Sequence, residues 1–318
     1  MDLKSKDQII AAAKRYMADK GLSQAAFARL CEVSPSYVSA MMNGVYEYKT
    51  SNDKVTPIAD RYFIAMASRI GMSVMAAYWR TVETPQFVEM ISTLEDAKER
   101  GVAKMIIGET GCGKTFATNK FIEANPVNTF KITVSNQHKI QEVTEDIGRV
   151  MNLDMPVHHR KAARMRIITD RLRELNAQEG HPQVIIDEAE NLTHGMIGLC
   201  KGIYDAINEY ASLILIGTPE LIVKLDTMER YSYKYAGIPQ FRRRFKAGTV
   251  HLTPIDRTKH YDAFLADVPD AELRTLLRGL CDNYGELHDF LEPALRNADK
   301  DGVALTDKYF RIMYKIGA

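Results

Sequence analysis

The segment from Gly108 to Thr115 constrains the fold of this chain more than any other. It matches the phosphate-loop pattern G-x-x-x-x-G-K-[ST] at every fixed position. The preceding residues, 104–107, are apolar and typical of a strand, and the following residues have helical spacing. A chance glycine-rich turn is the alternative, but the order strand, loop, helix favours a true phosphate loop.

This loop predicts binding of ATP with Mg²⁺. The residues whose backbone N–H groups would surround the phosphates are Gly108, Glu109, Thr110, Gly111, Cys112 and Gly113. Lys114 would offer its ammonium group to the β- and γ-phosphates, and the Thr115 hydroxyl would bind Mg²⁺. Cys112 fits best as a small filler residue. Alternatively, the helix N-terminus lowers its thiol pKa, and alkylation there blocks nucleotide binding.

Two later segments supply the catalytic groups such a loop requires. Residues 184–187 form an apolar strand that ends in Asp187 and Glu188. Asp187 is expected at the magnesium ion, and Glu188 is expected to orient or deprotonate the attacking water. The strand at 213–216 leads into Thr218, which is expected beside the γ-phosphate. The alternatives are two solvated acids after a strand, and a plain strand-end turn.

Three consecutive arginines, Arg242, Arg243 and Arg244, stand between Phe241 and Phe245. An arginine that reaches a neighbouring subunit's site would stabilise the charge of the transition state, and Arg244 is the preferred candidate for this role. A solvated basic turn and a contact with DNA phosphates are the alternatives.

The pattern of apolar segments predicts an α/β fold with a parallel five-stranded sheet. The candidate strands are residues 104–107, 130–134, 184–187, 213–216 and 249–252. Helix-length gaps separate them, as crossover connections require. We expect three domains: an all-helical domain at 1–82, the ATPase core at 83–253, and a small helical lid at 254–318. The lid helices are expected at 261–265, 272–281 and 287–295.

The N-terminal domain contains a predicted helix-turn-helix. Helices are expected to start after Ser23 and after Ser34, and the second ends at Asn43-Gly44. Residues 47–56 are polar and predict a loop. The expected core residues are Phe27, Leu30, Val33, Val38 and Met41.

The second helix would present Ser36, Tyr37 and Ala40 to the DNA major groove. This face carries no Arg or Lys, so base-specific recognition is expected to be weak. A three-helix bundle for protein contacts is the alternative.

The net charge is only +1, so any DNA site must be a local basic patch. Candidate phosphate contacts lie in the core domain: Lys139, Arg160, Lys161 and Arg164. A solvated helix face is the alternative. The four cysteines have no metal-site spacing, and no apolar run is long enough to span a bilayer, which predicts a cytoplasmic protein without membrane contact.

These motifs, in this order, resemble those of AAA+ ATPases, and most closely the phage Mu B-type transposition proteins, relatives of IstB- and TnsC-like helpers. The resemblance covers residues from about Phe87 to the C-terminus, and the helix-turn-helix in front of the core also fits. It implies homo-oligomeric rings or helical filaments on double-stranded DNA, formed with ATP and with little sequence preference. It also implies target capture for a partner transposase, and slow ATP hydrolysis that DNA or the partner stimulates.

One feature departs from the family pattern. The lid normally places a sensor arginine soon after a helix-starting glycine, and here His288 stands at that position after Gly285. Either His288 contacts the nucleotide or the sensor is lost. Two other functions share much of this sequence pattern: a helicase-loader ATPase and an ATP-switched helix-turn-helix transcription regulator.

Overall fold

The computed structural model describes residues 3–49, 55–71, 78–79, 81–155, 161–207 and 210–317. By their internal contacts the residues form two compact units. The nucleotide unit comprises residues 83–260 and 283–285, and the second unit comprises 1–82, 261–282 and 286–318. Residues 254–260, expected in the lid, belong to the nucleotide unit because Gln86 Nε2 donates hydrogen bonds to the carbonyls of Thr253 and Pro254.

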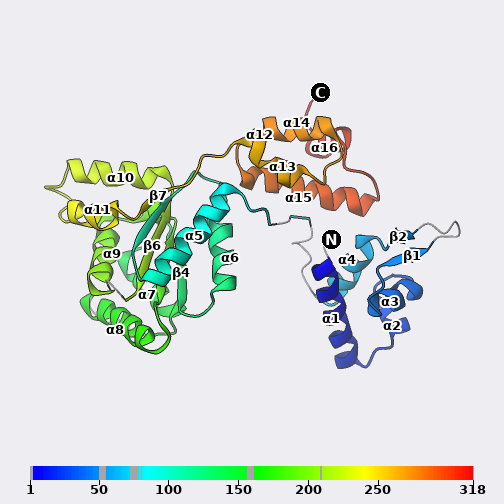
Figure 1. Cartoon of the computed structure of the whole chain (residues 1–318), viewed down its shortest axis with the longest axis horizontal. Helices are drawn as coiled ribbons and strands as arrows, with labels where there is room; N and C mark the ends of the chain where they lie inside the picture. Colours follow the sequence, from blue (N-terminus) through cyan, green and yellow to red (C-terminus); the bar gives the residue numbers. More distant parts are fainter. Residues whose placement is uncertain are drawn as a thin grey trace. The chain divides into compact units, whose positions relative to one another are not determined.

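The nucleotide unit is built on a five-stranded parallel sheet with the order β4-β5-β6-β3-β7 (Figure 1). The strands are β3 (Lys104–Ile107), β4 (Thr129–Thr133), β5 (Gln183–Asp187), β6 (Ser212–Gly217) and β7 (Thr249–His251). The predicted fold class is therefore confirmed, and each predicted strand end lies within one residue of the observed end.

Helices bury both faces of this sheet (Figure 1). They are α5 (Pro85–Arg100), α6 (Lys114–Ala124), α7 (Ile140–Val150), α8 (Lys161–Glu179), η2 (Ala189–Asn191), α9 (His194–Ile207), α10 (Pro219–Arg230) and α11 (Ile238–Lys246). The short helix α12 (Arg257–His260) has no buried residue and does not cover the sheet. Ile106 and Ile185 pack with α5 and α6, whereas Met105 and Val184 pack with α7 to α11. Alternate residues thus face opposite layers. Because the strands are parallel, the loops after β3, β5 and β6 meet at one edge.

The C-terminal part of the second unit is helical, as expected of a lid. Its helices are α13 (Asp262–Leu265), α14 (Ala271–Leu280), α15 (Tyr284–Asp301) and α16 (Asp307–Tyr314). The prediction of a short helix at 287–295 is wrong, because α15 continues through Pro293. Leu287, Leu291, Ala294 and Ala298 are buried at helical spacing, and burial of this apolar face outweighs the hydrogen bond lost at Pro293.

The N-terminal part contains the predicted helix-turn-helix together with a small hairpin. Its elements are α1 (Leu3–Lys20), α2 (Gln24–Leu30), α3 (Pro35–Met42), β1 (Glu47–Lys49), β2 (Val55–Pro57) and α4 (Asp60–Arg69). The domain is therefore not entirely helical. The antiparallel pair β1–β2 lies where a loop was expected, and Tyr48 on β1 packs against Tyr37 with ring centroids 5.4 Å apart. This tertiary contact stabilises a segment whose sequence is mostly polar.

The turn between α2 and α3 shows how the motif closes without glycine. Glu32 adopts a left-handed backbone with φ of 56°, a conformation that favours glycine. Ser23 caps α2 by accepting a hydrogen bond from the Ala26 N–H, but the Ser34 hydroxyl faces that of Ser36 and does not cap α3. Leu30 is exposed rather than in the core, because it is the last residue of the short helix α2. The other four predicted core residues are buried.

Candidate nucleotide and DNA sites

The phosphate loop lies between β3 and α6, at the carboxyl edge of the sheet. Gly111 and Gly113 have φ values of 72° and 90°, a left-handed conformation that favours glycine. A Cβ atom on Gly111 would lie only 2.1 Å from Asn283 Oδ1. Gly111 is therefore required both by its backbone conformation and by the close approach of Asn283.

Lys114 begins α6 and extends back across the loop. Its Nζ donates hydrogen bonds to the carbonyl oxygens of Gly108, at 2.8 Å, and Glu109, at 2.7 Å. The ammonium group is thus held directly against the loop, where the sequence places the phosphates.

Thr115 and Asp187 come together from two elements, as predicted. Thr115 Oγ1 donates a hydrogen bond to Asp187 Oδ2 at 3.1 Å, and the Glu188 N–H donates to Asp187 Oδ1 at 3.1 Å. The Asp187 side chain is 2% exposed. A hydroxyl and a carboxylate oxygen that converge beside a phosphate loop are the ligand types that Mg²⁺ prefers, so this pair fits the ion.

Glu188 follows Asp187 with a left-handed backbone, φ 56°, and an exposed side chain. Asn191 Nδ2 donates to Glu188 Oε2 at 3.3 Å and to the Val134 carbonyl at 2.9 Å. Asn191 therefore links the proposed catalytic carboxylate to the end of the neighbouring strand β4. We did not predict this role, although a polar residue one helical turn after Glu188 was a usable signal.

Thr218 lies at the carboxyl end of β6, at the N-cap of α10. Its N–H donates to Glu190 Oε2 at 3.2 Å. Its Oγ1 is buried without a hydrogen-bond partner among the described residues. A buried hydroxyl without a partner is costly and rare, and it fits a position that binds a ligand or a water molecule.

Residues 283–285 pack against the phosphate loop, although they are distant from it in sequence. The Gly285 N–H donates to the Gly111 carbonyl at 3.3 Å, and the Tyr284 hydroxyl donates to Gln86 Oε1 at 2.8 Å. Burial raises the pKa of Tyr284 to about 12. The predicted site included neither Asn283 nor Tyr284, because their position depends on the path of the chain between distant elements.

Cys112 is buried inside the loop, with 4% of its surface exposed. Burial raises the pKa of its thiol above the ordinary value. The alternative of an activated thiol is therefore wrong, because desolvation outweighs the helix N-terminus and the nearby Lys114. The simpler interpretation of Cys112 as a small filler residue agrees with the structure.

The three consecutive arginines lie on α11 in different environments. Arg242 forms ion pairs with Asp226 and Glu229, and Arg244 Nε lies 2.5 Å from Asp205 Oδ1. Arg243 is exposed and has no ion pair or hydrogen bond among the described residues. Of the three, Arg243 therefore makes the fewest contacts within its own chain among the described residues. Arg244 was the arginine predicted to reach a neighbouring subunit's site.

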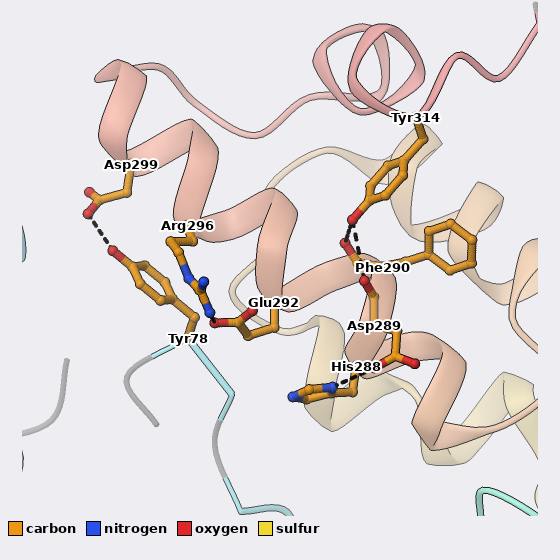
Figure 2. A network of polar contacts seen from close by, with 8 residues as sticks. All are labelled: Tyr78, His288, Asp289, Phe290, Glu292, Arg296, Asp299 and Tyr314. Carbon is orange, nitrogen blue, oxygen red and sulfur yellow. Dashed lines mark hydrogen bonds and ion pairs between the residues drawn. The ribbon is translucent and has the colours of Figure 1, made fainter. Parts of the chain in front are cut away.

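His288 lies on α15, in the second unit, whereas the phosphate loop lies in the nucleotide unit. Figure 2 shows its Nδ1 directed toward Asp289 Oδ1, 3.0 Å away. Trp79 contacts the imidazole edge-on, with ring centroids 5.1 Å apart. The neighbouring Tyr78 donates to Asp299 Oδ2 at 2.8 Å, also seen in Figure 2. Tyr78 and Trp79 thus both contact α15, which carries the predicted sensor residue.

Of the predicted DNA contacts, Arg164 is contradicted by the structure. Its side chain is 2% exposed and lies 2.7 Å from Glu145 Oε1, so it is a buried structural ion pair. The cationic sequence pattern did not reveal this, because Glu145 lies on another helix. Arg160 is outside the described residues.

Lys139 and Lys161 remain exposed, at the starts of α7 and α8. Lys161 Nζ lies 3.4 Å from the Gly195 carbonyl, and a Cβ atom on Gly195 would lie 3.7 Å from Ile140. These contacts place the two lysines on one side of the nucleotide unit. In the N-terminal domain Ser36 is exposed, but Tyr37 and Ala40 are half-buried against the domain core. The predicted reading face is therefore partly covered.

Comparison with known proteins agrees with this geometry. An AAA domain matches residues 99–225, and a helix-turn-helix matches residues 14–73. The DNA transposition protein B of the Mu-like prophage FluMu, from Haemophilus influenzae, is 24% identical over 257 residues, which cover 78% of this chain and 80% of that protein. The chain is thus similar to Mu B-type AAA+ proteins. The resemblance drawn from the motifs is thus confirmed.

A solved structure also supports the fold of this chain. The ORC1 protein of Aeropyrum pernix, determined in complex with DNA, superposes with a TM-score of 0.52 at 17% identity. The match covers 71% of this chain and 62% of the Aeropyrum chain, less than two thirds of its length. Site and comparisons together identify an AAA+ ATPase. No described helix is long and apolar enough to cross a membrane.

Proposed function

We propose that this protein hydrolyses ATP slowly, assembles with ATP on duplex DNA with little sequence preference, and delivers that DNA to a transposase. The observation that carries the ATPase part is the contact of Thr115 with Asp187 beside Glu188, together with Lys114 held against the phosphate loop. The helix-turn-helix, the Lys139–Lys161 pair and the likeness to a DNA transposition protein support the DNA part. Four free, buried cysteines suit a reducing cytoplasm.

Each residue of the site has a definite task in hydrolysis. Lys114 neutralises charge on the phosphates, and the N–H groups of the loop bind phosphate oxygens. Thr115 and Asp187 would hold Mg²⁺, which would supply positive charge that stabilises the negative charge on the phosphates. Glu188, held by Asn191, orients and deprotonates the attacking water, and Thr218 supports that water through its buried hydroxyl.

Assembly of subunits would couple the binding of ATP to the binding of DNA through thermodynamic linkage. If ATP stabilises contacts between subunits, and the assembled subunits present many lysines to DNA, ATP and DNA strengthen each other's binding. An arginine from one subunit would then complete its neighbour's site. We assign this role to Arg243 rather than Arg244, because Arg244 is paired with Asp205 of its own chain.

The test is binding to a long random-sequence duplex, measured by fluorescence anisotropy with ATP, with ADP and without nucleotide. Negative-stain images of the same samples would report rings or filaments. Tight binding with ATP alone, together with assemblies on DNA, is expected. Nucleotide-independent binding at one sequence would indicate the transcription regulator instead. Preference for single strands would indicate the helicase loader.

Two variants separate ATP binding from hydrolysis in the same assay. Lys114→Ala should abolish ATP-dependent DNA binding, because it removes the phosphate-binding cation. Glu188→Gln should keep binding but persist on DNA, because it cannot activate water. A Glu188→Gln protein that leaves DNA as fast as the unmodified protein would contradict the proposed link between hydrolysis and release.

A further inference from the structure

Lys131 places a second cation in the nucleotide site, and the sequence motifs do not account for it. It lies in the middle of β4, and its side chain is 14% exposed. Its Nζ lies 3.0 Å from Asp187 Oδ2 and 3.0 Å from Asn119 Oδ1. The ammonium group is therefore held between the end of β5 and the helix α6.

The backbone explains how Lys131 reaches this position. In the sheet register Lys131 lies opposite Ile185, and Thr133 lies opposite Asp187. Two residues of a strand span about 6.6 Å, a distance that an extended lysine side chain covers. Asn119 stands one helical turn after Thr115 on α6, so both side chains lie on the same face of that helix.

Lys131 and Thr115 contact the same oxygen of Asp187. Oδ2 accepts the hydroxyl of Thr115 at 3.1 Å as well as the ammonium of Lys131, while Oδ1 accepts the N–H of Glu188. A carboxylate that is 2% exposed requires a positive partner. Lys114 is directed elsewhere, toward the carbonyls of Gly108 and Glu109.

We propose that Lys131 is a built-in counter-cation of the magnesium site, which positions Asp187 and competes with Mg²⁺ for its Oδ2 oxygen. The inference rests on the proposed role of Thr115 and Asp187 as the magnesium-binding pair. A fixed positive charge beside the ion opposes binding of Mg²⁺, because like charges repel strongly where water is excluded. The same charge keeps Asp187 from repelling the triphosphate of ATP when Mg²⁺ is scarce. Lys131 thus acts as a positioning residue that sets how much magnesium the site requires.

The test measures binding of a fluorescent ATP analogue while Mg²⁺ is titrated. Lys131→Met removes the charge and keeps the length of the side chain. We expect the Mg²⁺ concentration at half-maximal binding to fall by about tenfold. In excess EDTA we expect Lys131→Met to bind the analogue several-fold more weakly than the unmodified protein. Lys131→Arg, which keeps the charge, should behave as the unmodified protein does in both conditions.

Lys104→Met is the matched control. Lys104 also lies in the sheet, is 18% exposed and pairs with an aspartate, Asp96, on α5. Its loss removes the same charge without touching Asp187. If Lys131→Met does not fold, as judged by circular dichroism, Lys131→Gln carries the test, because glutamine still donates a hydrogen bond to Asp187.

Equal magnesium midpoints for the unmodified protein and the uncharged Lys131 variants would overturn the inference, and so would an equal shift in Lys104→Met. Failure of the underlying magnesium assignment looks different. In that case Asp187→Asn would leave the magnesium dependence of the unmodified protein unchanged. If Asp187→Asn abolishes that dependence and Lys131→Met leaves the midpoint where it was, the assignment stands and the role of Lys131 fails.

Discussion

At the scale of single residues, the nucleotide site is organised around Asp187. Its two carboxylate oxygens accept hydrogen bonds from the Thr115 hydroxyl and the Glu188 N–H, and Lys131 supplies the opposite charge. These partners come from α6, β4 and the end of β5 itself, so the site exists only when the sheet is formed. Substitutions in the neighbouring phosphate loop should therefore change properties of this site that can be measured.

Gly111→Ala should lower the affinity for ATP in two separable ways. The left-handed backbone costs any other residue about 1–2 kcal/mol, and the new Cβ would collide with Asn283. We expect at least about a tenfold loss of affinity in a calorimetric titration. Adding Asn283→Gly should restore part of it, because the collision disappears and the backbone strain remains.

Gly113→Ala is the control for this experiment. Gly113 has a similar left-handed backbone, but the nearest atom to its Cβ position, on Tyr284, is 4.0 Å away. Asn283→Gly should give Gly113→Ala no recovery. Equal recovery in both variants would show that the contact between Gly111 and Asn283 is not the cause.

Cys112 should resist alkylation at neutral pH. Burial raises the pKa of its thiol, so little of Cys112 is the reactive thiolate near pH 7. The thiolate fraction becomes substantial only when the pH rises above the ordinary pKa of a thiol. Iodoacetamide labelling between pH 7 and 10, followed by peptide mapping, measures this. Labelling of Cys112 at pH 7 as fast as a free peptide thiol would contradict it.

At the scale of helices and strands, short polar contacts decide how elements begin and how they join. Asp270 is an example in the lid. Its Oδ1 caps α14 by accepting the N–H groups of Glu272 and Leu273, and its Oδ2 accepts the N–H of Asp307 at the start of α16. One carboxylate therefore joins the starts of two helices.

Asp270→Ala should destabilise the lid, and the effect should depend on pH. Hydrogen bonds from Asp307, Leu273 and Glu272 lower the pKa of Asp270. A carboxylate with a lowered pKa stabilises the fold above its unfolded pKa of about 3.9, and this stabilisation is lost as the pH falls through the lower folded value. Thermal unfolding at pH 7 should therefore show a clear difference between Asp270→Ala and the unmodified protein. That difference should shrink toward pH 2.

Asp270→Asn is the matched variant for this test. An asparagine oxygen can still cap α14, but it cannot also accept the N–H of Asp307. Its melting temperature should lie between those of the other two proteins. A difference from the unmodified protein that stays constant down to pH 2 would argue that the charge of Asp270 is irrelevant.

Lys139 and Lys161 both lie exposed at the start of a helix, α7 and α8 respectively. Lys139→Ala with Lys161→Ala should weaken duplex binding equally on all sequences and reduce the salt slope by about 2. Lys120→Ala is the control, since Lys120 pairs with Glu123 on the outer surface of α6. An unchanged salt slope in the double variant would place DNA elsewhere.

At the scale of the whole molecule, the proposed cycle needs more than one copy of the chain. Arg243 on α11 is exposed, and its neighbours Arg242 and Arg244 are tied to acidic residues of the same chain. An unpaired arginine on a rigid helix is suited to reach another subunit's nucleotide, because the helix fixes its direction without using its charge.

Arg243→Ala should lower DNA-stimulated ATP hydrolysis by roughly 10³-fold while ATP still binds. Mixing it with Glu188→Gln should restore part of the activity, because Glu188→Gln subunits supply an intact arginine to Arg243→Ala sites. Arg242→Ala serves as a control. It should lower the melting temperature, because its ion pairs are lost, but it should change the rate of ATP hydrolysis much less than Arg243→Ala does. No recovery in the mixture would mean that the arginine does not act between subunits.

The phosphate loop, the five strands and the helix-turn-helix were predictable because each depends on residues adjacent in the chain. Glycine spacing, apolar periodicity and cap residues act over one turn or one strand, and these interactions form in the same way wherever the segment lies. The hairpin at Glu47–Lys49 and Val55–Pro57 escaped prediction because a tyrosine from α3 stabilises it. The length of α15 escaped prediction because burial of its apolar face outweighs the energetic cost of Pro293 within the helix.

Tertiary structure alone decided which charged groups are free and which are paired. Arg164 is buried against Glu145, Arg244 is bound to Asp205, and Lys131 meets Asp187, although these partners lie 19, 39 and 56 residues apart. The energy of a charge depends on its distance from other charges and from water, and neither distance is encoded by neighbouring residues. The chemistry of the nucleotide site was therefore readable in the chain, whereas its electrostatics arose only when the sheet and helices brought distant side chains together.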